Sequence, residues 1–182
     1  MDLDAMDITS VIKFMFEYLL PTAKLNREGL AFLEAKVAAA DNRSSEGFLL
    51  TERAEVMAKR ASYLDDEVTR IGEFIIQYAK HAKAEYLEQK QNNKNLIEVA
   101  QAWKRWQVVG DFLKSRVSNA ELAVAHATEM AVVAKDLRGP VRGGAAKEEA
   151  KQQTQEAQLV LEELARHSAI VEEARALVRA FI

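Results

Sequence analysis

The sequence predicts an all-α protein: an elongated antiparallel helical bundle of three long coiled-coil-like helices, preceded by shorter N-terminal helices. The chain has 182 residues with only 7 glycines and 2 prolines, and it is rich in residues that favour helices. Apolar residues recur at alternating spacings of three and four over three long stretches, which is the pattern of helices packed along their length. The length suits one continuous core, so we expect a single domain over residues 1–182.

The first predicted element is a short apolar helix over residues 8–20, which contains the segment VIKFMFEYLLP. Thr9, Lys13 and Glu17 fall on one narrow polar line of its helical wheel, and apolar side chains cover most of the rest. Three uses remain open: burial in the bundle, docking into a partner protein, or contact with a membrane, for which the basic residues are too few. The candidate docking residues are Val11, Ile12, Phe14, Met15, Phe16, Tyr18 and Leu19.

A second short helix is expected over residues 23–40, with Leu25, Phe32, Leu33 and Val37 on or near one face. The first long helix is predicted over residues 50–90, with Ser45 or Thr51 as the residue that caps its start. Its expected inward positions are Leu50, Ala54, Met57, Ala61, Leu64, Val68, Ile71, Ile75, Tyr78 and Ala82.

The polar stretch QNNKN leads to a second long helix, predicted over residues 95–137. The segment RGPVRGG, residues 138–144, then breaks the helix, because proline cannot continue it and glycine favours turns. A third long helix is predicted over residues 146–182. Its expected inward positions are Ala150, Gln153, Ala157, Val160, Leu164, His167, Val171, Ala174, Val178 and Phe181.

Two tryptophans and a glycine stand close together in the second long helix, in the segment AWKRWQVVGDF. Trp103 and Trp106 both fall on the predicted inward stripe, and Gly110 lies one turn after Trp106. A glycine inside a helix costs about 1 kcal/mol relative to alanine, so a structural reason for it is expected. We predict close packing, with the glycine making room for an indole from another helix; a hinge in the long helix is the alternative.

No constellation of residues in the sequence predicts catalysis, a cofactor or a metal site. The chain has no cysteine, and no nucleophile, base and acid stand in a recognisable pattern. Its three histidines, His81, His126 and His167, fall at different heights on the predicted helices, so they do not converge on a metal ion. His167 alone falls on an inward position, and we interpret it as a partly exposed residue near the surface, because burying an unpaired ring is unfavourable. The alternative is a hydrogen-bonded residue that sets the helix register, or a pH-sensitive point. The chain is therefore predicted not to be an enzyme.

The net charge of -3, with both signs interspersed, disfavours nucleic acid as a partner. Acidic residues precede the first apolar segment, where an export signal carries positive charge, so a cytoplasmic location is expected. The sequence favours a non-enzymatic adaptor, assembly subunit or regulator that acts through protein–protein interaction or self-association. The alternative is a membrane-engaging helical bundle that inserts residues 8–20, similar in outline to soluble helical pore-forming proteins.

Overall fold

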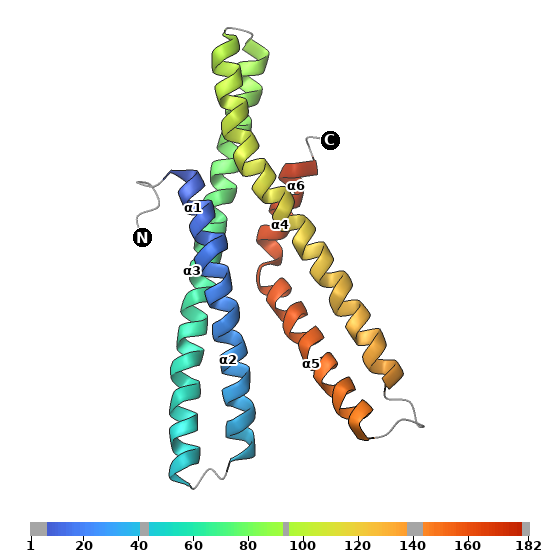
Figure 1. The fold of residues 1–182 in the computed structure, drawn as a ribbon. Helices are drawn as coiled ribbons and strands as arrows, with labels where there is room; N and C mark the ends of the chain where they lie inside the picture. The colour runs from blue at the N-terminus through green and yellow to red at the C-terminus, as the bar shows by residue number, and fades with distance from the viewer. Residues whose placement is uncertain (1–6, 41–43, 93–94, 138–143, 180–182) are drawn as a thin grey trace. The chain divides into compact units, whose positions relative to one another are not determined.

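All secondary structure in the computed structural model of the chain is helical in the residues that it describes, which are 7–40, 44–92, 95–137 and 144–179 (Figure 1). The predicted all-α class is confirmed, and the helices pack as a bundle that includes three long ones. The chain divides into two compact units, Met1–Tyr78 and Ala79–Ile182, and the long helix α3 contributes to both. The single-domain organisation stays a prediction.

The two short helices expected at the N-terminus form one uninterrupted helical run, so their predicted separation is wrong. The run consists of α1 (Ile8–Phe14), a π-helical turn η1 (Met15–Leu19) and α2 (Leu20–Ala39). Pro21 lies in the first turn of α2. A proline has no N–H to donate and clashes with the carbonyl four residues earlier. The wider π turn, in which Leu20 donates to the Met15 carbonyl, lets the helix continue past this point.

α3 (Ser45–Asn92) runs back along α2, and the two form the hairpin of the first unit (Figure 1). It begins five residues before the predicted start at 50, because Ser44 caps it, not Ser45 or Thr51: its hydroxyl accepts from the Gly47 N–H at 3.0 Å. The predicted inward stripe holds along this helix. Ala61, Leu64, Val68, Ile71, Ile75 and Ala82 are buried, while Leu50, Ala54, Met57 and Tyr78 are half-buried.

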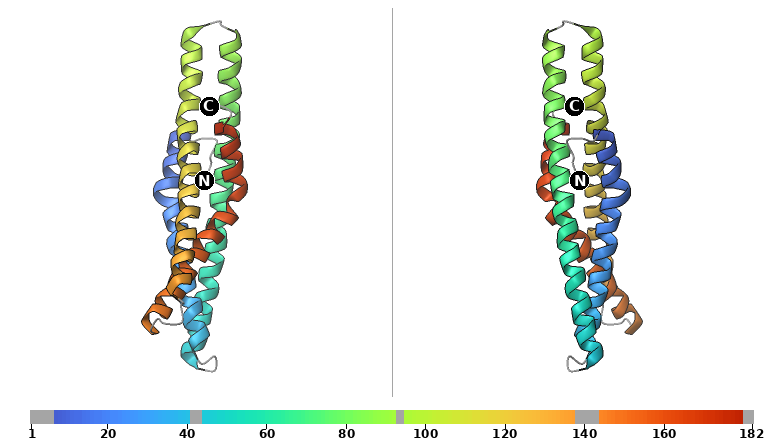
Figure 2. Two further views of the ribbon diagram at one scale, coloured as in Figure 1. Left: turned by 90° about the vertical axis from the view of Figure 1, so that its right-hand side faces the viewer. Right: turned by 90° about the vertical axis from the view of Figure 1, so that its left-hand side faces the viewer.

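The second unit is built from the C-terminal part of α3, α4 (Leu96–Leu137), α5 (Gly144–Arg166) and α6 (Ser168–Arg179). α4 packs against both α5 and α6. Beyond Ala79, α3 and α4 run side by side in Figures 1 and 2. The predicted turn over residues 138–144 lies, apart from Gly144, outside the described residues, as does Phe181.

The third long helix, predicted as continuous from 146 to 182, is interrupted at His167 and forms α5 and α6. His167 is buried, with 6% of its surface exposed, so the prediction of a partly exposed ring is wrong. Its main-chain carbonyl accepts from the Val171 N–H at 3.1 Å, which starts the new helix. The buried stripe continues through Val171 and Ala174 after the interruption.

Candidate functional site

The N-terminal candidates for docking are divided between the interior and the surface. Val11, Met15 and Leu19 are buried. Ile12 and Phe14 are half-buried, whereas Phe16 and Tyr18 are exposed. The Phe14 and Tyr18 rings stack with centroids 6.2 Å apart, so part of the aromatic surface is covered within the helix itself. Val11, Met15 and Leu19, which repeat every four residues, are therefore part of the buried core and are not available for docking.

The tryptophan and glycine candidates on α4 have separate environments. Trp106 is buried, while Trp103 is 38% exposed and packs against Tyr86 with ring centroids 5.1 Å apart. Ala102 and Val109 are buried, so the stripe that faces the interior passes through Ala102 and not, as predicted, through the neighbouring Trp103. A Cβ on Gly110 would lie 3.4 Å from the Trp106 ring. The glycine thus lies beside the indole of its own helix, and not beside one from another helix as expected.

The described residues contain no group of three or more histidine, cysteine, aspartate or glutamate side chains that could hold a metal ion. His81 and His126 are both exposed on the helices that carry them. In the second unit, a 290 Å³ pocket lies beside the interruption at His167. Arg175 lines it and donates to Glu121 at 3.3 Å and to Glu172 of its own helix, so its charge is already balanced within the fold.

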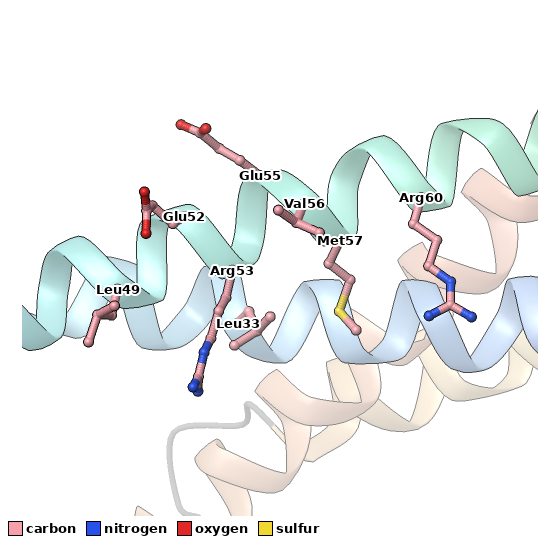
Figure 3. Close-up of a pocket in the computed structure, with 8 residues that line it drawn as sticks. All are labelled: Leu33, Leu49, Glu52, Arg53, Glu55, Val56, Met57 and Arg60. Carbon is pink, nitrogen blue, oxygen red and sulfur yellow. The ribbon is translucent and has the colours of Figure 1, made fainter.

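Another candidate site is an open groove of about 620 Å³ between α2 and the first part of α3, which we call the α2–α3 groove. Figure 3 shows its side chains: Leu33 comes from α2 and all the others from α3. Arg53 and Arg60 reach toward α2, while Glu52 and Glu55 point away from it. The lining residues are Leu33, Leu49, Glu52, Arg53, Glu55, Val56, Met57 and Arg60.

Contacts between α2 and α3 fix which side of each helix faces the other. The Asn26 side-chain amide donates to the Met57 carbonyl at 3.2 Å, and a Cβ on Gly29 would lie 3.2 Å from the Met57 side chain. Arg27 pairs with Asp65 on one side of this contact line. Successive residues are rotated by about 100° around a helix axis. The side of the contact line opposite to Arg27 and Asp65 therefore carries exposed large apolar residues on both helices.

The exposed large apolar residues on this side of α2 and α3 form what we call the apolar face of the hairpin. Its members are spaced by seven residues, two on α2 and three on α3, so that each helix carries a straight strip beside the α2–α3 groove. Each side chain is more than half exposed, at 53% to 68%. The apolar face consists of Leu25, Phe32, Leu49, Val56 and Tyr63.

Positive charge lies along the groove between these two strips. Arg53 and Arg60 are exposed, and neither has an ion pair or hydrogen bond among the described residues. They are seven residues apart, which is about 10.5 Å along a helix. Lys36 of α2 lies on the same side, with its ammonium 4.6 Å from the centroid of the Phe32 ring. The groove therefore combines apolar walls with cationic groups that are accessible to a ligand.

The far end of the α3 strip is electrostatically balanced. Arg70 donates to Glu67 at 2.8 Å, one turn after Tyr63. This hydrogen bond lowers the pKa of Glu67 below its ordinary value, against the opposing effect of desolvation, and raises the pKa of Arg70. Glu67 thus has a partner of its own, whereas Arg53 and Arg60 have no ion pair in the part of the chain that the structure describes.

The sequence pattern placed Leu25 and Phe32 on or near one face of their helix and did not single out Leu49, Val56 or Tyr63. The available signal was the second apolar row on α3, seven residues apart and displaced from the inward stripe. The two arginines repeat with the same period. Such a doubled stripe indicates a helix that packs on one side and has further apolar surface on the next.

The chain has no significant match to a family model, a curated protein or a solved structure. No helix in the described ranges is both long and apolar enough to span a bilayer.

Proposed function

We propose that the protein is a non-enzymatic adaptor, assembly subunit or regulator of the cytoplasm that acts by binding another polypeptide through the apolar face of the α2–α3 hairpin. The observation that carries this proposal is the exposure of five large apolar side chains in two parallel strips. Isolated exposed apolar residues are common, but a contiguous set beside a groove is typical of an interaction surface. Two helices that present adjoining strips provide the kind of groove into which a third helix packs.

The proposal favours the hairpin over the apolar segment at residues 8–20. Val11, Met15 and Leu19 are buried, so using them for docking or for membrane insertion would first require α1 to leave its place beside α3 (Figure 1). The apolar face needs no such rearrangement. It is accessible in the folded hairpin, and its residues do not contribute to the buried core.

Site-specific photo-cross-linking in cells of the native source tests this function. A photoreactive amino acid replaces Val56 on the apolar face, and in a matched control it replaces Ser62, which is exposed on the other side of α3. We expect adducts with a defined polypeptide from position 56 and none from position 62. Substituting Leu25 and Phe32 with serine should reduce the adduct, because it removes one apolar strip.

Equal labelling from both positions, or labelling of lipid alone, would contradict the proposed function. Far-ultraviolet circular dichroism of each purified variant controls for folding. All the substituted side chains are more than a third exposed, so we expect the helical signal to be unchanged.

A further inference from the structure

We propose that the occupant of the α2–α3 groove is an acidic amphipathic helix, with carboxylates seven residues apart that pair with Arg53 and Arg60. This inference rests on the proposed function and specifies the chemistry of the partner. A helix laid along the groove repeats its side chains with the same rise as α3, so groups at i and i+7 are separated by about 10.5 Å on both. Two carboxylates at that spacing can reach the two guanidinium groups together.

The walls of the groove specify the rest of the pattern. Between the two carboxylates, positions i+3 and i+4 of the docked helix face the same direction. Apolar residues there would lie over Leu33 and Met57, which line the groove between the arginines. The flanking strips, with Phe32 on α2 and Val56 on α3, would cover the sides of these apolar residues of the partner. The expected partner motif is an acidic residue at position i, apolar residues at i+3 and i+4, and a second acidic residue at i+7, with residues of any type between them.

The length of the surface is sufficient for such a helix. Leu49 and Tyr63 mark the ends of the α3 strip and are 14 residues apart, which is about 21 Å along the helix. A partner helix of about four turns would therefore span the face. Five apolar side chains that each expose roughly 100 Å² supply a small interface, below the roughly 800 Å² per partner of a standard one. We accordingly expect reversible binding to which the ion pairs make a measurable contribution.

A second copy of the same hairpin is a poorer occupant. Two copies placed face to face would bring Arg53 and Arg60 of one against the same residues of the other. Glu52 and Glu55 point away from α2 and so do not neutralise this charge (Figure 3). Like charges brought together at an interface oppose association, so the groove disfavours self-association and favours a partner of opposite charge.

The test uses two synthetic helical peptides of 21 residues that are identical except at two positions seven residues apart. One peptide carries glutamate at both positions and the other carries lysine, with leucine at the two apolar positions between them. Fluorescence anisotropy measures the binding of each peptide to the full chain. We expect the glutamate peptide to bind at least about tenfold more tightly, because two ion pairs are replaced by two repulsive contacts.

Charge reversal in the protein identifies the residues responsible. Arg53→Glu with Arg60→Glu should reverse the preference, so that the lysine peptide binds more tightly. Lys59→Glu is the matched control: Lys59 is exposed on the same helix but is not one of the residues that line the groove, so the preference should remain. Added salt should reduce the difference between the peptides, since exposed charges are screened.

Equal affinity for the two peptides, no binding of the glutamate peptide, or an unchanged preference in the double variant would overturn the inference. Binding to vesicles of anionic lipid, lost on the same charge reversal while the glutamate peptide fails to bind, would replace the helix with a membrane surface and also overturn it. The proposed function fails separately. If position 56 cross-links to a polypeptide but the peptides are not distinguished, binding through the apolar face stands and the acidic helix is wrong.

Discussion

The side-chain amide of Asn26 donates to the main-chain carbonyl of Met57 across the α2–α3 hairpin at 3.2 Å. Asn26 is 6% exposed and is one of two buried polar or charged residues among those described, the other being His167. An amide on an otherwise apolar contact line favours one alignment of two helices, because sliding either helix leaves the amide without its acceptor. This alignment positions the two apolar strips on either side of the α2–α3 groove.

Replacing Asn26 with alanine should destabilise the first unit by about 1 kcal/mol, through loss of the hydrogen bond and of buried volume. The expected net effect includes a small favourable term, because alanine has a higher helix propensity than asparagine. Asn119→Ala measures that term alone, since Asn119 is exposed in the middle of α4. Urea denaturation of both variants gives the difference. Equal stability changes would show that the hydrogen bond contributes nothing.

The ion pair between Arg27 and Asp65 should be worth more than the exposed pairs of the same hairpin. Its side chains are only 13% and 20% exposed, whereas those of Lys24 and Glu28 are 65% and 54% exposed. Asp65→Ala leaves the guanidinium largely buried without this carboxylate, so we expect a loss of about 2 kcal/mol. Glu28→Ala should change stability by a few tenths of a kcal/mol.

A double-mutant cycle with Arg27→Met tests whether this loss reflects the pair itself. The coupling energy between positions 27 and 65 should be about 1 kcal/mol or more and should depend little on salt, because the pair is shielded from solvent. If thermal denaturation without added denaturant gives a coupling energy near zero, the two side chains contribute independently to stability.

Gly110→Ala should stabilise the second unit by about 0.5 to 1 kcal/mol. The added Cβ would lie 3.4 Å from the Trp106 ring, an ordinary contact distance, and alanine removes the helix penalty of glycine. Gly29→Ala is the informative comparison, since its Cβ would lie 3.2 Å from the Met57 side chain and require that side chain to move. We expect a smaller stabilisation there. Thermal unfolding that shows Gly110→Ala to be destabilising would mean that the added methyl group clashes with the Trp106 ring, so that the glycine is required for close packing.

Much of the fold was predictable from the sequence because it depends on repeated apolar spacing. The stripe through Val68, Ile71 and Ile75 is buried as the pattern indicates. The pattern is less decisive where a helix carries two candidate stripes: on α4 both include Trp106, and the structure buries Ala102 and Val109 while leaving Trp103 partly exposed. Periodicity alone does not choose between two stripes one residue apart, because tertiary packing decides between them.

The interruptions were harder to predict than the stripes. Pro21 resembles a helix stop, but a π turn carries the chain past it, and this depends on the local hydrogen bonds rather than on composition. The break at His167 has no proline or glycine to announce it. The candidate site shares this difficulty, since Leu25 and Phe32 resemble core residues until Asn26 and Gly29 show which side of α2 meets α3.

The start of α1 should depend on pH through Asp7. Its carboxylate accepts from the main-chain N–H groups of Thr9 and Ser10, both at 3.2 Å, and these hydrogen bonds lower its pKa from 3.8, the Thr9 bond most. Because the folded pKa lies below the unfolded one, the contribution is present above the unfolded pKa and is lost as the pH falls through the folded pKa.

Amide NMR signals of Thr9 and Ser10 followed from pH 7 downward should therefore titrate with a midpoint below 3.8 as the first turn of α1 frays. Asp7→Asn is the matched control, because asparagine also caps helices but carries no titrating charge in this range. Its amide signals should remain unchanged where those of the original chain move. A midpoint at or above 3.8 would mean that the cap does not stabilise the ionised carboxylate, since only preferential binding of the charged form depresses a pKa.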